Sequence, residues 1–241
     1  MVGAIRASAA ALYDLFLPRI CSVCGALLGP LDDTVCTACR STFRPVGPVV
    51  CPTCGRPAER ALAKRCRRCP AEPVYFASAR AAFLYRDDLA EAVRLFKYNR
   101  RFELGRMLAR AMFMTIQNDD PDAVRPDMIV PVPMHFLRRL HRGYNHAALL
   151  AEEYARLAAI PYSPDILARI RHTRRQTLLP PERRATNVLG AFEVLCPERV
   201  QGLRMRLVDD VFTSGHTVNE CARTLSAAGA ASVHVLALSC A

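Results

Sequence analysis

The chain has 241 residues, of which 51% are hydrophobic and 23% charged, and this balance supports a packed core and excludes global disorder. The formal net charge of +11 favours polyanionic partners such as phosphates, pyrophosphate or nucleic acid, although the absence of tryptophan argues against a broad base-stacking surface. No apolar stretch approaches the roughly eighteen residues of a membrane-spanning helix, so we expect no membrane insertion.

The first 20 residues predict a short amphipathic helix. Its apolar face would carry Ile5, Leu12, Leu15 and Phe16. A signal peptide is the alternative, but Asp14 interrupts the apolar stretch, and residues 18–20 before Cys21 lack the small side chains that a cleavage or lipidation site requires. We therefore expect a cytoplasmic protein.

Eight of the eleven cysteines form four CxxC pairs. The pairs are Cys21/Cys24, Cys36/Cys39, Cys51/Cys54 and Cys66/Cys69. A shift of 30 residues maps the first four cysteines onto the last four, and Gly25 onto Gly55. Residues 21–72 therefore predict a duplicated metal module, a double zinc ribbon.

The CxxC spacing suits zinc, because a tight turn aims two sulfurs at one point about 2.3 Å away and two such turns complete a tetrahedron. Disulfides are one alternative, although a cytoplasmic chain keeps its thiols reduced, and an iron–sulfur cluster is another. The repeat favours sequential sites, but a cross-braced arrangement would use the same eight residues. The spare cysteines show no ligand spacing and predict packing roles; they are Cys196, Cys221 and Cys240.

Two bound zinc ions would change both the charge and the stability of the chain. Four thiolates and one dication carry a net charge of −2, so the metallated chain would have a net charge of about +7. A site closed by four cysteines leaves no open position for catalysis, whereas the metal supplies folding energy that so small a core cannot. We expect a structural or partner-docking module.

Beyond residue 73 the pattern changes to alternating strands and helices. Asp88 is expected to cap a helix, with Glu91 completing a capping box. That helix would bury Leu89, Ala92, Val93 and Phe96. The other expected elements are helices 102–116, 144–158 and 217–228, a short buried strand from Asp127 to a proline loop, and strands 204–208 and 232–238. This alternation predicts an α/β domain over residues 73–241, with a parallel sheet flanked by helices on both faces.

Residues 204–217 predict a binding site for a ribose that carries a 5-phosphate. The strand ends in Asp209 and Asp210, whose carboxylates can accept hydrogen bonds from neighbouring sugar hydroxyls, and ligands of parallel sheets bind beyond such strand ends. The next loop opens a helix and offers hydroxyls and backbone N–H groups to a phosphate. Its residues are Thr213, Ser214, Gly215, His216 and Thr217. A strand-end turn with solvated acids is the alternative interpretation.

This segment resembles the signature of the type I phosphoribosyltransferases, and further motifs extend the resemblance to the ComF (GntX-like) family over nearly the whole chain. Lys97-Tyr98 is similar to the family's KY helix end, and the cysteine pairs are similar to its zinc region. Its PVP…RGFN block is matched by residues 131–134, Arg138, Arg139 and 142–145. Its TxxQxxL…R..N block is matched by Thr173, Gln176, Leu179, Arg184 and Asn187. The departures are small: Tyr144 replaces phenylalanine and Ser214 replaces threonine.

The resemblance implies a phosphoribosyltransferase-like domain that binds phosphoribosyl pyrophosphate (PRPP) with magnesium. Its pyrophosphate loop would consist of Pro131, Val132, Pro133 and Met134. The arginine-dense stretch 169–184 would close over the reaction, where it would neutralise the departing pyrophosphate and exclude water. A solvated basic face or a nucleic-acid groove is the alternative for that stretch. The candidate catalytic residues are Arg142, Arg174 and Arg184.

Two functions are therefore compatible with the sequence. The first is a magnesium-dependent transfer of phosphoribose to or from an acceptor that the sequence does not define. The second is a non-catalytic competence protein that retains the fold and handles single-stranded DNA or contacts DNA-uptake proteins, since the family is associated with natural competence. A functional acceptor pocket would distinguish the first from the second.

Overall fold

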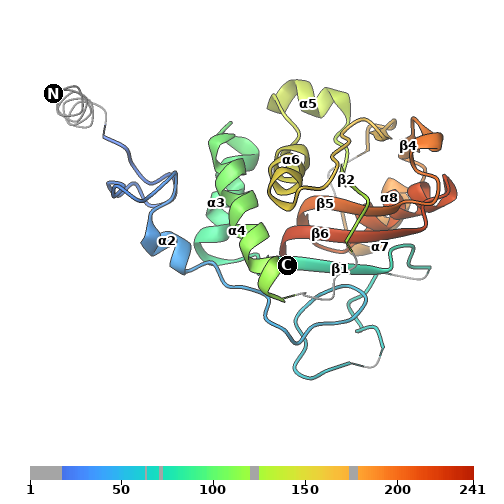
Figure 1. Cartoon of the computed structure of the whole chain (residues 1–241), viewed down its shortest axis with the longest axis horizontal. Coiled ribbons are helices and arrows are strands. Elements are labelled where there is room, and N and C mark those ends of the chain that lie inside the picture. Colours follow the sequence, from blue (N-terminus) through green and yellow to red (C-terminus); the bar gives the residue numbers. More distant parts are fainter. Residues whose placement is uncertain (1–17, 63, 71–72, 120–124, 174–178) are drawn as a thin grey trace.

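The computed structural model of the chain describes residues 18–62, 64–70, 73–119, 125–173 and 179–241 (Figure 1). The cysteine-rich segment 18–70 consists of turns and loops with one short helix, α2 (Thr37–Ser41). It precedes an α/β domain. The predicted helix over residues 1–20 lies outside the described residues up to residue 17, and residues 18–20 are not helical.

The centre of the domain is a parallel sheet of four strands in the order β1-β6-β5-β2. The strands are β1 (Ser78–Leu84), β2 (Met128–Pro131), β5 (Arg204–Phe212) and β6 (Ser232–Cys240). Of the two central strands, β6 is rich in valine, leucine and alanine, and its last six residues are all buried. Such a nearly continuous apolar strand is typical of a parallel sheet that is covered on both faces.

Three long helices cover one face of the sheet (Figure 1). They are α3 (Asp87–Tyr98), α4 (Glu103–Asp119) and α6 (His146–Ala158). In α3 the buried side chains Leu89, Val93 and Phe96 recur at helical spacing and pack into one cluster with Ile129 and Leu236 of the sheet. Each such side chain contributes about 1.5–3 kcal/mol by its burial, so apolar packing holds this layer in place.

The opposite face is covered by α8 and by a small antiparallel pair of strands, β3 and β4. Val218 and Leu225 of α8 are buried in the same cluster as Phe192 of β4. The elements of this side and of the rim are β3 (Leu167–Arg169), α7 (Pro181–Val188), β4 (Phe192–Val194), the 3-10 helix η2 (Pro197–Arg199), α8 (His216–Ala227) and α5 (Phe136–Arg142). The predicted fold class, a parallel sheet flanked by helices behind a cysteine-rich module, is confirmed.

The cysteine-rich segment also lies along the outer edge of β1. The N–H of Val46 donates to the backbone oxygen of Ala82, and the N–H of Leu84 donates to that of Arg44, at 3.0 and 2.9 Å. Pro45 forms an isolated bridge with Phe83 between them. The edge of the sheet is therefore hydrogen-bonded to the chain that joins the two cysteine clusters.

Several element boundaries differ from the predicted ones. The predicted cap at Asp88 is wrong: α3 begins at Asp87, its N-cap is Arg86 without a side-chain cap bond, and Asp88 lies in the first turn, where a carboxylate favours the helix dipole. β5 continues to Phe212, because β6 pairs with it as far as Cys240. Asp209 and Asp210 consequently lie inside β5, although both lie beyond the end of its other neighbour, β2, which pairs only up to Pro131 and Val208.

Candidate functional site

The eight cysteines form two separate groups, each with its four sulfurs within 4.8 Å of one another. We call residues 21–39 the first ribbon and residues 51–70 the second ribbon. Sulfur pairs lie 3.5–3.7 Å apart at Cys24–Cys36, Cys51–Cys69 and Cys54–Cys66. Tetrahedral zinc with bonds of about 2.3 Å places its sulfurs about 3.8 Å apart. Both groups therefore fit zinc, and the sites are sequential rather than cross-braced.

The backbone prepares these sulfurs for a metal. The N–H of Cys36 donates to Cys21 Sγ and that of Cys66 to Cys51 Sγ, at 3.3 and 3.2 Å. Burial alone would raise the pKa of Cys21 and Cys51, but backbone donors outweigh it and lower both pKa values to about 6. Both thiols therefore favour the thiolate, which is the form that binds zinc. Four thiolates close each site, so these zinc ions are structural.

A cleft of about 200 Å³ lies beyond the end of β2, beside the part of β5 that continues past it. Residues from seven parts of the chain line it: Lys97, Tyr98, Val132, Pro133, Met134, Arg138, Arg142, Asn145, His146, Ala147, Arg169, Asp209, Asp210 and Thr217. This is the carboxyl edge of the sheet, where parallel α/β folds bind their ligands. The predicted carboxylate pair and the predicted pyrophosphate loop thus meet in one place.

The two carboxylates of the cleft have different charge states. Lys97 Nζ lies 2.9 Å from Asp210 Oδ1, and both side chains are largely buried. Burial by itself would raise the pKa of Asp210, but Lys97 outweighs it and holds that pKa below its ordinary value. Burial and the neighbouring charge of Asp210 raise the pKa of Asp209 to about 7. The pair therefore provides one carboxylate that is ionised throughout the neutral range and one that titrates within it.

His146, the first residue of α6, lines the cleft. Its Nε2 lies 3.1 Å from the backbone oxygen of Lys97, and because a carbonyl only accepts, Nε2 is the protonated nitrogen. Burial lowers the pKa of His146 to about 4, so the ring is neutral. Its buried Nδ1 is then an acceptor, and it has no hydrogen-bond partner among the described residues. A ligand hydroxyl is a suitable donor for it.

The proline loop is fixed by backbone and side-chain bonds. The N–H of Val132 donates to Val208 O at 2.8 Å, and Asn145 Nδ2 donates to Val132 O at 3.0 Å. Asn145 also caps α6, because its side chain accepts from the N–H of Ala147. Pro131 belongs to β2, so the loop proper consists of the three residues that line the cleft, from Val132 to Met134.

Residues 213–217, which we call the α8 loop, form the entrance to α8. Gly215 caps the helix with a φ of +78°, a conformation that favours glycine. Thr217 lines the cleft, whereas the cleft does not extend to the other four predicted residues of this loop. The N-terminus of α8 points its partial positive charge at this loop, as anion sites require.

The structure describes two of the three predicted catalytic arginines. Arg142 lines the cleft, with its guanidinium 4.9 Å from the ring centre of Tyr98. Arg184 lies on α7, where its Nε donates to Leu179 O at 3.1 Å. Its charge reaches the α8 loop, because the pKa of His216 is lowered by burial and then by Arg184. Arg174 lies outside the described residues.

Sequence reasoning missed His146 altogether and assigned no separate role to Asn145 or Arg169. Arg169 lines the cleft from β3, with its guanidinium 5.2 Å from the ring centre of Phe192, and its buried Nε has no partner among the described residues. The polar pair Asn145-His146 at the start of an alanine-rich helix is the available signal, because asparagine is a preferred N-cap residue and an inward-facing polar side chain is unusual there.

Comparisons with known proteins support the two-part organisation. Residues 12–70 match the double zinc ribbon domain family. The chain is 33% identical over 161 residues to competence protein F of Haemophilus influenzae, covering 64% of this chain and 69% of that protein. It is 34% identical over 175 residues to DNA utilization protein YhgH of Salmonella typhi, covering 72% of this chain and 76% of that protein.

Among solved structures, the chain resembles a glutamine PRPP amidotransferase from B. subtilis, with 26% sequence identity and a TM-score of 0.36. That match covers 57% of this chain and 26% of the amidotransferase chain, so this chain spans about a quarter of its length. A TM-score this low supports no functional assignment. No helix among the described residues combines the length and the apolar character needed to cross a membrane.

Proposed function

This chain belongs to the ComF (GntX-like) family, and we propose that its cleft binds a ribose-5-phosphate ligand, PRPP with magnesium, for transfer of phosphoribose to an acceptor. The observation that carries this proposal is the position of Asp209 and Asp210 in one cleft with Thr217 of the α8 loop. The two adjacent carboxylates can accept hydrogen bonds from the sugar hydroxyls, and the helix N-terminus one short loop away can bind the phosphate at the other end of the ligand.

Each part of the cleft has a chemical counterpart in PRPP. The carboxylates of Asp209 and Asp210, together with Nδ1 of His146, would accept hydrogen bonds from ribose hydroxyls. The α8 loop would bind the 5-phosphate through backbone N–H groups. The pyrophosphate would lie at the proline loop, where three cleft-lining arginines supply positive charge; these are Arg138, Arg142 and Arg169.

In such a transfer, the bond between ribose C1 and a pyrophosphate oxygen breaks, and the electron pair leaves with the pyrophosphate. The acceptor forms the new bond at C1 and loses its proton to solvent. Cations placed around the pyrophosphate stabilise the charge that develops on it, which lowers the barrier. Magnesium prefers carboxylate and phosphate oxygens, so Asp209, Asp210 and the pyrophosphate form a suitable donor set, and the metal would add to this neutralisation.

Calorimetry with ribose-5-phosphate, and with PRPP plus magnesium, tests the proposal. Asp210→Asn should weaken binding by about 10- to 100-fold, the effect of losing one charged acceptor. Asp165→Asn is the matched control, because that carboxylate is paired with Arg199 on the surface, away from the cleft-lining residues, and should leave the affinity unchanged. Absence of binding by the wild-type protein at millimolar ligand would overturn the proposal. Turnover assays with nucleobases and amines would then identify the acceptor.

A second candidate function is binding of single-stranded DNA. It is favoured by α5, none of whose residues is buried. This helix exposes Phe136, Leu137 and Leu140 beside four basic residues, Arg138, Arg139, His141 and Arg142. Apolar and aromatic surface next to cations is what single-stranded nucleic acid binds through stacking and phosphate contacts. The relatives named as competence and DNA utilization proteins are consistent with this candidate.

A further inference from the structure

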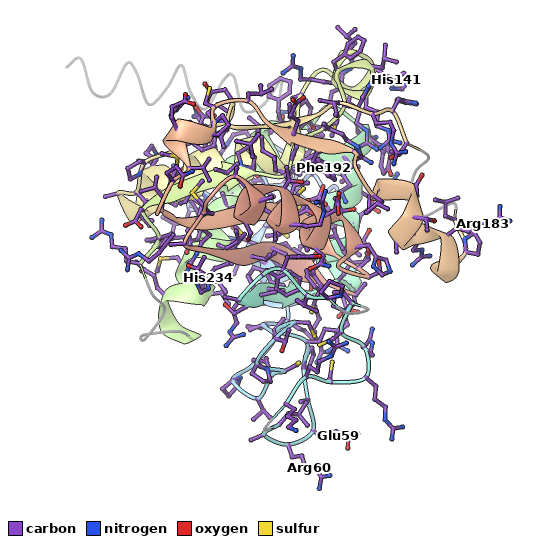
Figure 2. The ribbon with its side chains drawn as sticks, turned by 90° about the vertical axis from the view of Figure 1, so that its right-hand side faces the viewer. Glu59, Arg60, His141, Arg183, Phe192 and His234 are labelled. Carbon is purple, nitrogen blue, oxygen red and sulfur yellow. The ribbon has the colours of Figure 1, made fainter. Side chains whose placement is uncertain are left out.

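The second ribbon is built into the core of the α/β domain. Cys51 and Cys54 belong to the same hydrophobic cluster as Phe212, the last residue of β5. The N–H of Ala79 in β1 donates to Thr53 O at 2.7 Å, so the turn between the two cysteines lies against the sheet. Figure 2 shows the rest of this ribbon projecting away from the sheet, with Glu59 and Arg60 at its far tip.

Arg56 connects this ribbon to the residue that precedes the α8 loop. Its side chain is buried, with 4% of the residue exposed. The guanidinium lies 5.1 Å from the ring centre of Phe212 and donates to the backbone oxygens of Arg68 and Ala241, at 2.5 and 3.4 Å. A second arginine of the ribbon, Arg68, donates to the same oxygen of Ala241 at 2.9 Å. The ribbon is therefore in direct contact with Phe212.

Pro70, at the end of the second ribbon, contacts the α8 loop directly. A methyl group added at Gly215 would lie 2.6 Å from Pro70 Cγ and 2.9 Å from the Phe212 ring, so the loop backbone packs against both rings. The chain just after the ribbon is bonded to the first turns of α8, because Asn219 accepts from the N–H of Tyr75 and donates to the backbone oxygen of Pro73, at 2.8 and 2.9 Å. Pro70, Phe212 and Asn219, which make these contacts, are not among the residues that line the cleft.

We propose that the second ribbon holds the α8 loop in its ligand-binding position, and that Arg56 and Pro70 are positioning residues for the 5-phosphate. This inference rests on the proposed function. A segment as short as the second ribbon depends on its metal for folding, so the positions of Arg56 and Pro70 depend on the second zinc. A loop that binds phosphate through backbone N–H groups loses affinity when those groups shift by a fraction of an ångström.

The experiment compares Cys66→Ser in the second ribbon with Cys36→Ser at the repeat-related position of the first. Two further variants, Arg56→Met and Pro70→Ala, keep all eight cysteines and should retain two zinc ions per chain by elemental analysis. Arg40→Met, directly after the first ribbon, is their control, because among the described residues its side chain is paired with Asp32 and Thr37. Amide hydrogen exchange of residues 212–219 and calorimetry with ribose-5-phosphate and with inorganic pyrophosphate are measured on each variant.

We expect faster exchange of residues 212–219 in Cys66→Ser, Arg56→Met and Pro70→Ala, and wild-type exchange in Cys36→Ser and Arg40→Met. Ribose-5-phosphate affinity should fall by about tenfold in the three second-ribbon variants, the effect of one lost hydrogen bond. Pyrophosphate affinity should stay unchanged, because that anion would bind at the proline loop.

Unchanged exchange of residues 212–219 in Arg56→Met and Pro70→Ala would overturn the inference, as would an equal effect of Cys36→Ser. The exchange measurement needs no ligand, so it decides the inference even if the wild-type protein binds no ribose-5-phosphate, which would overturn the proposed function instead. An equal loss of pyrophosphate and ribose-5-phosphate affinity would indicate general loosening of the cleft and would also contradict a specific role for the loop.

Discussion

The two ribbons have the same cysteine spacing but different surroundings in the structure. The first packs on α3 and α4, where its Val35 joins the helical cluster. Phe43, a few residues after it, joins the same cluster, and its ring centre lies 5.9 Å from that of Phe83. The second lies on the opposite cluster and contacts the α8 loop. Figure 1 shows the first beside α3 and the second beneath β1. Cysteine spacing thus determines the metal geometry, whereas the neighbours of each ribbon determine what its metal supports.

The largest expected effect is on stability after loss of one zinc ligand. Cys54 is buried in the core cluster of the α/β domain, whereas Cys24 is exposed. Cys54→Ser should therefore lower the thermal midpoint of the domain by more than about 10 °C, and Cys24→Ser by less than about 3 °C. Each variant should retain one of two zinc ions. Calorimetry and elemental analysis check this, and equal midpoint shifts would contradict the contrast between the ribbons.

A matched pair of glycine variants tests the same contrast between the two ribbons without changing a zinc-binding cysteine. Gly25 and Gly55 both have a positive φ, 74° and 65°, so alanine at either position costs about 1–2 kcal/mol. A methyl group at Gly25 meets open space, whereas one at Gly55 would lie 2.2 Å from the backbone oxygen of Ala79. Gly55→Ala should therefore cost more than about 3 kcal/mol in denaturant unfolding. Equal costs would show that the second ribbon is free to move away from β1.

A smaller effect, a pH dependence of the free energy of unfolding, is expected from Asp209 in the cleft, which belongs to neither ribbon. The pKa of Asp209 is raised to about 7, far above its ordinary value of 3.8, so between these values the folded chain holds a proton that the unfolded chain lacks. The free energy of unfolding should therefore fall as pH rises from about 4 to about 7, by an amount on the order of 1–3 kcal/mol. Ligand affinity should rise over the upper part of this window, because the ionised carboxylate accepts hydrogen bonds.

Asp209→Asn should abolish the part of the pH slope that lies between about 5 and about 7, measured by denaturant unfolding in a series of buffers. Asp165→Asn is the control, because hydrogen bonds from Ser163 and Arg199 lower the pKa of Asp165 and place its titration below this window. A slope that survives in Asp209→Asn would assign the proton to another group.

The smallest expected effect concerns nucleic acid, and it distinguishes α5 from the first ribbon as the contact surface. Affinity for single-stranded DNA should fall with salt, with a slope of about −0.7 per phosphate contacted. Arg139→Ala on α5 should reduce that slope by about 0.7, whereas Arg44→Ala, beside the first ribbon, should leave it unchanged. Titrations at four salt concentrations measure both slopes. A loss confined to Arg44→Ala would place the nucleic acid on the cysteine-rich segment.

Much of the fold could be predicted from the sequence, because its signals are local. The zinc-ligand sets follow from the CxxC spacing, and the parallel sheet follows from the alternation of apolar strands and helices. The carboxylate pair follows from two adjacent aspartates in the sequence. The extension of β5 to Phe212 could not be predicted, because it depends on where β6 stops pairing, at Cys240. The position of α3's first residue likewise depends on its contacts, since Asp87 pairs with Arg44 of the cysteine-rich segment.

The parts of the site that the sequence did not predict are non-local. Pro70 and Gly215 are separated by 145 positions, and no spacing rule joins them. The role of His146 depends on which nitrogen faces Lys97, a choice made by the packing of α6 against α3. The number of arginines follows from the sequence, but their positions do not. The sequence predicts a catalytic role for both Arg142 and Arg184, and of these two Arg142 lines the cleft.

The hydrogen bonds along β1 have a consequence for solubility. An open edge strand offers a row of unpaired N–H and C=O groups to any other strand and so promotes self-association. Here the chain between the ribbons occupies that edge at Ala82 and Leu84, and the second ribbon occupies it at Ala79. The opposite edge is covered as well, because Ile129 of β2 bonds with Pro161 and Ser163. Metal-stabilised loops thus occupy the position that an additional strand would take. We expect loss of zinc to expose the edge of β1, where other strands could then pair and start aggregation.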